Sequence, residues 1–226
     1  MSRLPPMPRE ADVLLINEFF LSIQGESTQA GRLCFFVRLT GCHLRCGYCD
    51  TEYAFYEGKA FTVDEVVARV REAGSPLVQI TGGEPLLQKP VYPLMERLVD
   101  AGYDVMLETS GSLDASRVPP GVRRVFDIKT PGSGEVDANR WENFTANALR
   151  DGDEIKFVIC SRADYEWARD VVRGRLAGLV DFPVLFSPEW NTAVPSDLAD
   201  WIVADRLPVR FQVQTHKVLW GDRPGV

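Results

Sequence analysis

The stretch Thr40-Gly-Cys-His-Leu-Arg-Cys-Gly-Tyr-Cys-Asp-Thr51 holds three cysteines, Cys42, Cys46 and Cys49, in a C-x3-C-x2-C spacing. Three thiolates can bind an iron–sulfur cluster and leave one iron without a protein ligand, and a small molecule can coordinate that open iron. A closed zinc site needs four ligands, and His43 lies too near Cys42 in the sequence to complete the tetrahedron easily. The spacing therefore favours an iron–sulfur cluster over a zinc site.

The composition points the same way. Five cysteines are an odd number for a disulfide framework, and residues 1–11 form a proline-rich polar segment rather than a targeting peptide. We expect the chain to reside in the reducing cytoplasm, which suits an oxygen-sensitive cluster. The net charge is −7, Lys and Arg form no basic stripe, and no apolar run is long enough to cross a membrane. Neither nucleic acid nor a membrane is therefore expected as a direct partner.

Apolar, β-rich runs alternate with amphipathic runs, which is the pattern of repeated β-α units. The expected strands are Val13–Phe20, Cys34–Leu39, Leu77–Thr81, Asp104–Glu108, Val125–Ile128, Ile155–Ile159, Val184–Phe186 and Val209–Gln214. The expected helices run from the capping box Thr62-Val-Asp-Glu65 to Gly74, from Pro90 to Gly102, over Asp164–Leu176, and over Ser196–Asp205 with Ser196 as the cap.

Strands that alternate with helices imply a parallel sheet with right-handed crossovers, whose active groups gather at the carboxyl ends of the strands. The cysteines, the pair Gly82 and Gly83, and Lys129 each follow such a strand. About six core strands are too few for an eight-fold barrel. We therefore expect a single α/β domain over residues 1–226, built as an open, partial β/α barrel of about six parallel strands. Residues 1–11 would form a flexible tail, and residues 212–226 would lie near the active site.

The cysteines are followed, after one helix and one strand, by Gly82-Gly83-Glu84-Pro85, and this combination resembles the radical S-adenosylmethionine (SAM) superfamily. Taken alone, Gly-Gly-Glu-Pro is a common turn, and its position after the cysteines is what favours a cofactor site. The resemblance implies that Cys42, Cys46 and Cys49 hold a 4Fe–4S cluster and that SAM chelates the fourth iron. An electron from the reduced cluster would then split SAM and yield a 5′-deoxyadenosyl radical.

The same resemblance implies further contacts with SAM. Gly82 and Gly83 let the end of a strand approach a ligand closely, and we expect their amides to bind the methionine end of the cofactor. Glu108 ends the next strand and is a candidate partner of the ribose, with a solvated strand-end carboxylate as the alternative. The full set expected to bind SAM is Tyr48, Cys49, Asp50, Gly82, Gly83, Glu84, Glu108, Asp127, Ile128 and Lys129.

Within the superfamily, four short signatures resemble the 7-carboxy-7-deazaguanine synthase family. They are Ser22-Ile23-Gln24-Gly25-Glu26 followed by Gly31-Arg32, then Cys49-Asp50-Thr51, Gln79-Ile80-Thr81 and Gln214-Thr215-His216-Lys217. Each is weak by itself, and their order and positions carry the resemblance. It implies a lyase that contracts the reduced ring of 6-carboxy-5,6,7,8-tetrahydropterin, loses ammonia and forms 7-carboxy-7-deazaguanine, the core of queuosine and related 7-deazapurines. SAM would act as a reusable cofactor, so no side chain is assigned as a catalytic acid or base.

The family resemblance also implies sites for Mg²⁺ and for the substrate. It assigns Mg²⁺ to the hydroxyl of Thr51, for which a helix cap is the alternative role. Arg38 lies on an apolar strand and needs an acidic partner, and we favour the substrate carboxylate over a carboxylate of the protein. His216 has a structural alternative, as lone histidines after strands often do. The expected substrate contacts are Ile23, Gln24, Gly25, Glu26, Arg38, Thr81, His216 and Val226.

Two other classes of protein remain open. A glycyl-radical activase shares the three cysteines but acts on a protein backbone, and it is not expected to carry the four signatures. A non-enzymatic electron carrier normally closes every coordination site of its cluster, which argues against that class here. The resemblance further implies an external electron donor of flavodoxin or ferredoxin type and a homodimer.

Overall fold

The computed structural model describes residues 4–5, 11–179, 181–223 and 225–226, so most of the predicted flexible tail, residues 1–11, lies outside the described residues. In the described ranges, one sheet has the strand order β3-β1-β2-β4-β5-β6-β7-β8-β9. The strands are β1 (Val13–Ile23), β2 (Leu33–Leu39), β3 (Lys59–Thr62), β4 (Leu77–Gly82), β5 (Asp104–Thr109), β6 (Val122–Ile128), β7 (Glu154–Ile159), β8 (Val184–Pro188) and β9 (Arg210–Phe211). The α-helices are α1 (Val63–Ala73), α2 (Val91–Asp100), α3 (Arg162–Arg173), α4 (Pro195–Asp205) and α5 (Thr215–Trp220). The 3-10 turns are η1 (Glu52–Phe55), η2 (Pro85–Leu87), η3 (Pro131–Ser133), η4 (Val136–Ala138) and η5 (Trp141–Asn143).

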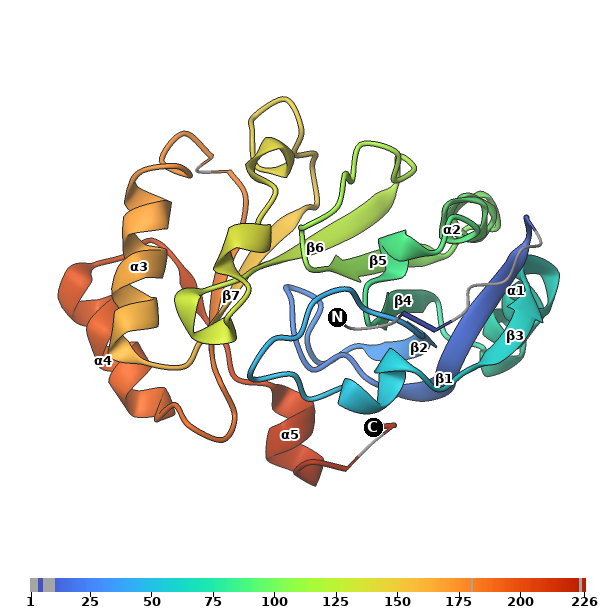
Figure 1. Cartoon of the computed structure of the whole chain (residues 1–226), viewed down its shortest axis with the longest axis horizontal. Helices are drawn as coiled ribbons and strands as arrows, with labels where there is room; N and C mark the ends of the chain where they lie inside the picture. Colours follow the sequence, from blue (N-terminus) through green and yellow to red (C-terminus); the bar gives the residue numbers. More distant parts are fainter. Residues whose placement is uncertain (1–3, 6–10, 180, 224) are drawn as a thin grey trace.

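The sheet is an open, mostly parallel barrel. β2 and β4 to β9 pair in parallel, whereas β1 pairs antiparallel with β2 and with β3. β3 and β9 are the two edges, so the barrel does not close on itself. Figure 1 shows the sheet curving between α1 and α2 at one end and α3 and α4 at the other. The expected open, partial barrel is confirmed, and the antiparallel edge strand β3 is one that the sequence did not predict.

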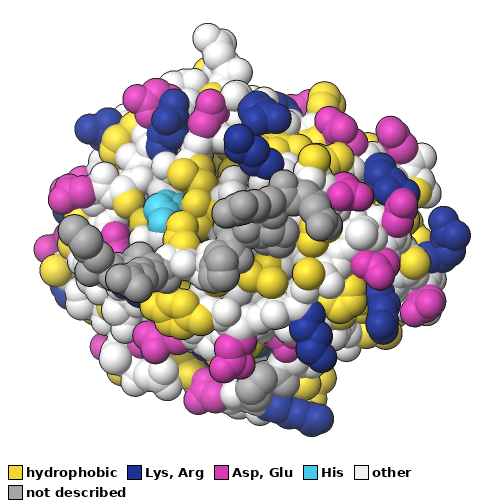
Figure 2. Space-filling model, turned by 45° about the vertical axis from the view of Figure 1, so that its right-hand side comes forward, with side chains coloured by type: hydrophobic (Ala, Val, Ile, Leu, Met, Phe, Trp, Pro, Cys, Tyr) yellow, Lys and Arg dark blue, Asp and Glu magenta, His cyan; other side chains and the backbone are white. Residues whose placement is uncertain are grey.

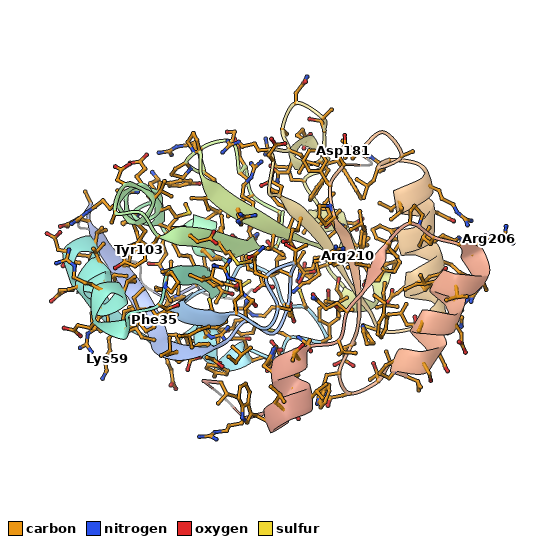
Figure 3. The ribbon with its side chains drawn as sticks, turned by 180° about the vertical axis from the view of Figure 1, so that it is seen from behind. Phe35, Lys59, Tyr103, Asp181, Arg206 and Arg210 are labelled. Carbon is orange, nitrogen blue, oxygen red and sulfur yellow. The ribbon has the colours of Figure 1, made fainter. Side chains whose placement is uncertain are left out.

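The main hydrophobic core lies between the helices and the outer face of the sheet. Leu94 of α2, Phe126 of β6 and Tyr165 of α3 are fully buried in it. Figure 3 shows the same elements from behind, with Phe35 of β2 on this core face and Arg206 at the exposed end of α4. Side chains alternate along a strand, so in each parallel strand the residues between those that face the core point to the inside of the barrel. The helices therefore cover the outer face and leave the inner face for a cavity.

The helix starts were predicted in part. The capping box of α1 is present: Thr62 Oγ1 accepts from the Glu65 N–H at 3.2 Å, and Glu65 Oε2 accepts from the Thr62 N–H at 2.7 Å. The prediction that Ser196 caps the fourth helix is wrong, because α4 begins at Pro195 after Val194. Proline has a helical φ and no N–H to satisfy, so it suits the first position of a helix, and α4 therefore begins earlier in the chain than predicted. α3 likewise begins earlier than predicted, with Ser161 as its cap.

The end of the chain differs most from the prediction. β9 covers only Arg210–Phe211 instead of Val209–Gln214, and the helix α5 was not predicted. The chain leaves the sheet at Gln212, whose side chain accepts from the Ser27 N–H at 2.7 Å and donates to Ser27 O at 2.8 Å. The sequence patterns along residues 209–214 do not reveal this partner, which lies far away in the chain.

Two surface properties bear on possible partners. On the face shown in Figure 2, Lys and Arg side chains are interspersed with Asp and Glu, and no stripe of one sign forms. Within the described ranges, none of the helices has the length and apolar character needed to cross a membrane.

Candidate active site

A large cavity opens on the inner face of the sheet. Along the strands, inward-facing side chains change from apolar ones, such as Phe36 and Met106, to polar ones, such as Thr81 and Glu108, toward the carboxyl ends. The cavity holds about 1290 Å³ of empty space, part of it open to solvent, and the cysteine loop lines one side. A cavity with several convergent polar side chains is typical of a small-molecule site.

Cys42, Cys46 and Cys49 lie on the loop between β2 and η1. The loop is held by the Gly47 N–H, which donates to Ser133 O at 2.9 Å. Burial raises the pKa of all three thiols, that of Cys46 to about 11, so bound iron is needed to keep them as thiolates. Within the described part of the chain, no three His, Cys, Asp or Glu side chains converge on one ion. Three cysteines around one cavity without such convergence suit a cluster several ångströms across better than a single zinc ion.

Gly82 and Gly83 end β4 directly against the cysteine loop. A Cβ at Gly82 would overlap the carbonyl oxygen of Leu39, and one at Gly83 would overlap that of Gly41, so both positions require glycine. The Gly83 N–H donates to Leu39 O at 3.1 Å. The expectation that this amide is free for the methionine end of SAM is therefore wrong, and any contact from Gly83 to a ligand has to come from its other atoms.

Two residues predicted to bind SAM do not line the cavity, Glu84 and Ile128. Glu84 is fully buried and accepts from the Ser110 N–H at 2.8 Å, the Ser110 hydroxyl at 2.6 Å and the Leu86 N–H at 3.0 Å. It ties the turn after β4 to the end of β5. The side chain of Ile128 points to the main core, because it has the parity of the outer face of β6.

Tyr48, Asp127 and Lys129 form a polar group beside the cysteines. Lys129 Nζ lies 3.0 Å from Asp127 Oδ2 and 5.5 Å from the centre of the Tyr48 ring. Burial opposes the charge of Lys129, but Asp127 and its other neighbours raise its pKa well above the usual value. Asp127 Oδ1 and the Tyr48 hydroxyl are buried without a hydrogen-bond partner. Such unsatisfied polar atoms indicate a ligand-binding position, because buried polar groups are normally paired.

A second polar group, centred on Lys156 of β7, lies deeper in the barrel. Lys156 Nζ is 2.6 Å from Glu26 Oε2, 2.6 Å from Glu108 Oε1 and 3.7 Å from Asp127 Oδ2. Thr81 Oγ1 also donates to Glu108 Oε2, at 3.2 Å. Burial would raise the pKa of Glu108, but Lys156 holds it below the usual range. Glu108 is thus an ionised carboxylate inside the cavity and not a solvated strand end.

Arg38 has a partner within the protein. Its Nε lies 2.7 Å from Glu18 Oε1, the kind of carboxylate left open as the alternative, and the Tyr53 hydroxyl donates to the same oxygen at 2.8 Å. The guanidinium still lines the cavity. It carries five N–H donors, so one bond to Glu18 leaves donors for a second carboxylate.

Thr51 and His216 both line the cavity. Thr51 occupies the N-cap position of η1, but its hydroxyl makes no capping bond and instead donates to Asp50 Oδ1 at 2.8 Å. The ring of His216 packs against Gly25, where a Cβ would overlap the ring. Burial lowers the pKa of His216, so its imidazole is neutral near pH 7.

Comparison with known proteins agrees with this geometry. A sequence profile of the radical SAM superfamily matches residues 36–127. The 7-carboxy-7-deazaguanine synthases of Koribacter versatilis and Chlorobaculum tepidum are each 46% identical to the chain, over 91% and 94% of it and 96% and 97% of their own lengths. The chain belongs to the 7-carboxy-7-deazaguanine synthase family.

The fold also agrees with two solved structures. QueE from Escherichia coli is similar with a TM-score of 0.68 and 24% identity, over 90% of this chain and 95% of that one. SuiB from Streptococcus suis, bound to S-adenosylmethionine, is similar with a TM-score of 0.58 and 15% identity, over 77% of this chain and 48% of that one. At these identities the likeness supports the fold alone.

Membership of the radical SAM superfamily implies a 4Fe–4S cluster and SAM, and the cavity of this synthase-family chain fits both. The three cysteines provide thiolates on one side, and the unpartnered atoms of Tyr48 and Asp127 lie in the same cavity. Of all residues predicted to bind the cluster, SAM, Mg²⁺ or substrate, every one except Glu84 and Ile128 lines this cavity.

The sequence predicted no role for several cavity residues of this family member. Lys156 lies in the strand Glu154-Ile-Lys-Phe-Val-Ile159, where a charge interrupts an apolar run, which is the same signal that identified Arg38. Glu189 and Trp190 follow β8 and also line the cavity, without any motif that marks them. The Lys156 signal was present in the sequence and was missed.

Proposed function

We propose that the chain converts 6-carboxy-5,6,7,8-tetrahydropterin into 7-carboxy-7-deazaguanine, the product for which its relatives are named. One observation carries the proposal beyond the family name. A single cavity holds the cysteine triad at its mouth and, at its base, the acceptor side chains Glu26 and Glu108. A radical source and a frame for a nitrogen-rich heterocycle are thereby placed within reach of one another.

The residues beside the cysteines would hold the cofactors. Cys42, Cys46 and Cys49 would bind the cluster, while Asp127 and Lys129 would pair with the ammonium and carboxylate groups of SAM. Cluster and SAM, when bound, supply a carbon-centred radical able to remove a hydrogen atom from the substrate. The cavity walls would exclude water from that radical.

The deeper residues would hold the substrate. Glu26 would accept hydrogen bonds from the amino-pyrimidinone edge. Glu108, first expected to bind the ribose of SAM, is assigned to the same edge, because Lys156 Nζ lies 2.6 Å from both carboxylates. Arg38 would bind the carboxylate with the donors that Glu18 leaves free. We assign Mg²⁺ to the hydroxyl of Thr51, where the carboxylate of the substrate would supply negative charge. The neutral ring of His216 would close the side of the pocket near Gly25.

Further parts of the proposal concern partners and location. We expect an external electron donor of flavodoxin or ferredoxin type, a homodimer, and a reducing cytoplasmic setting. The resemblance to the family supports these expectations.

Anaerobically reconstituted protein tests the proposed function. With the tetrahydropterin, SAM, reductant and Mg²⁺, it should release ammonia and a product with the mass of 7-carboxy-7-deazaguanine. If no such product forms, and 5′-deoxyadenosine accumulates only when a peptide substrate is added, the activity is that of a glycyl-radical activase and the proposal is wrong.

A further inference from the structure

Lys156 occupies a position in the cavity to which no role has been assigned. Its side chain is 5% exposed, and its ammonium group lies 2.6 Å from both Glu26 Oε2 and Glu108 Oε1. Among the described residues, it is the one basic side chain within ion-pair distance of these two carboxylates. Arg38 is instead paired with Glu18, Lys129 with Asp127, and Lys217 with Asp50. Lys156 is therefore the cation that joins Glu26 to Glu108.

The other neighbours of the two carboxylates are also donors. Glu108 Oε2 accepts from Gln79 Nε2 at 2.8 Å and from Thr81 Oγ1 at 3.2 Å, and Glu26 Oε1 accepts from Gln214 Nε2 at close range. A carboxylate offers about four acceptor positions, so neither group is saturated by these bonds. What remains on the cavity side is acceptor capacity alone.

We propose that Lys156 determines substrate specificity by pairing with Glu26 and Glu108, so that both carboxylates present acceptors and no donors to the cavity. The cavity then selects a heterocycle whose edge carries adjacent N–H donors, as the 2-amino-4-oxopyrimidine edge of a pterin does. It rejects a ring with a carbonyl oxygen in place of the 2-amino group. The inference rests on the proposed function, and Lys156 acts in it as a positioning residue through the two glutamates.

The difference between a pterin ring and a lumazine ring should make the selection strong. A lumazine differs from a pterin in having a carbonyl oxygen where the pterin has an amino group, so its oxygen would face carboxylate lone pairs. Sites built around a substrate N–H reject analogues that lack it by factors on the order of 10⁴, because buried polar groups are left unpaired. We expect a preference for the pterin of at least about 10³-fold in the wild-type protein.

Removing the charge of Lys156 should change both the preference and its pH dependence. Burial raises the pKa of Glu108, and Lys156 is the strongest influence that lowers it, so Lys156→Met removes the main opposition to burial and should raise this pKa, with Arg38 still left to lower it. The protonated carboxyl can donate to a carbonyl oxygen. The charged and titratable groups that face the pair from the surrounding elements are Arg38, Asp50, Asp127, Lys129 and His216. Histidine is the side chain in this list whose ordinary pKa lies closest to the pH range of the experiment, so the variant Lys156→Met/His216→Gln separates its contribution.

The experiment measures kcat/KM in the presence of reductant and equilibrium binding in its absence. Both are measured for 6-carboxytetrahydropterin and 6-carboxytetrahydrolumazine between pH 6 and 9. Lys156→Met should lower the pterin-to-lumazine ratio at least about 10-fold at pH 7, and affinity for the pterin should rise with pH as Glu108 ionises. Lys156→Arg should retain most of the preference, because it keeps the positive charge. Lys156→Met/Glu108→Gln serves if the single variant folds poorly, and it should lose both the preference and the new pH dependence.

Arg124→Met is the matched control, because Arg124 forms a buried ion pair with Asp153 outside the cavity. It should lower stability and leave the pterin-to-lumazine ratio unchanged. If the wild-type protein binds and converts the pterin, but Lys156→Met keeps the wild-type ratio at every pH, the inference is wrong and Lys156 is structural. If the wild-type protein does not convert the pterin, the proposed function itself fails.

Discussion

Lys217 Nζ lies 2.8 Å from Asp50 Oδ2, so α5 is ion-paired to the residue that directly follows Cys49. The same segment is bonded to the loop after β1, since the Thr215 N–H donates to Gly25 O at 3.0 Å. Residues expected to bind the cofactors and residues expected to bind the substrate are thereby joined through one short helix at the end of the chain (Figure 1). These contacts support the prediction that the segment beginning at residue 212 lies near the active site, which remains a prediction.

Lys217→Met should loosen this connection and make it sensitive to pH. Burial would raise the pKa of Asp50, but the ion pair and hydrogen bond with Lys217 lower it to about 2. In the wild-type protein the stabilisation from ionised Asp50 is fully present above pH ~4 and is lost only as the pH falls toward 2. Without Lys217 the loss should begin at higher pH. Because Asp50 is half-exposed, we expect the KM for the pterin to rise by only about two- to fivefold at pH 7.

Steady-state kinetics from pH 5 to 8 check this prediction, with Lys217→Arg as the control that keeps the charge. A KM and pH profile identical to the wild type in Lys217→Met would show that the ion pair does not secure the end of the chain.

Glu84→Ala should reduce stability rather than remove a direct contact with SAM. The substitution leaves the buried Ser110 N–H without its acceptor, together with other donors to this carboxylate. We expect the free energy of unfolding to fall by about 2–3 kcal/mol, measured by urea denaturation of the cluster-free protein. Glu142→Ala is the matched control, because Glu142 is exposed, and it should change stability by less than about 0.5 kcal/mol. Unchanged stability together with lost SAM binding would make Glu84 a ligand after all.

Cys46→Ala should remove the iron-dependent absorbance and all turnover. Two thiolates and a cluster with two open irons do not make a stable site, so the reconstituted variant should hold little iron. Cys160→Ala is the control, because burial raises the pKa of this thiol to about 12 and it does not line the cavity. A full complement of iron in Cys46→Ala would contradict the assignment of the triad.

Thr51→Ala should weaken the response to Mg²⁺ and leave the cluster intact. The hydroxyl makes no capping bond in η1, so its removal should have little effect on local structure. We expect the Mg²⁺ concentration for half-maximal activity to rise several-fold while iron content stays constant, and Thr51→Ser should behave as the wild type. An unchanged Mg²⁺ titration in Thr51→Ala would rule out the proposed ligand.

The sequence was sufficient for the fold and for recognising the cysteine motif because both depend on local signals. The cysteine spacing, the alternation of strands and helices, and the capping box at Thr62 each involve residues close together in the chain. Contacts between distant segments were harder to predict. The Gln212 side chain accepts a hydrogen bond from the Ser27 N–H, and the Gly83 N–H donates to the Leu39 carbonyl oxygen. The sequence around Gln212 and Gly83 does not reveal these partners.

The substrate end was predicted less completely for a related reason. Arg38 and Lys156 carry the same signal, a charge within an apolar strand, but only Arg38 lay near a recognisable signature. Among the residues expected to bind SAM, Glu84 and Ile128 do not line the cavity, because adjacency to a motif does not fix the direction in which a side chain points. Strand parity places Ile128 in the core, and the turn after β4 directs Glu84 toward β5.

The most direct test of the account is the yield of product per molecule of SAM. Wild-type protein is reconstituted anaerobically and given a large excess of 6-carboxy-5,6,7,8-tetrahydropterin over SAM, with reductant and Mg²⁺. The account predicts that 7-carboxy-7-deazaguanine, identified by mass, accumulates well beyond the amount of SAM supplied, because the radical abstracts a hydrogen atom from a pterin held in the same cavity and SAM is regenerated. A pterin that remains unchanged while SAM is consumed to 5′-deoxyadenosine would contradict it.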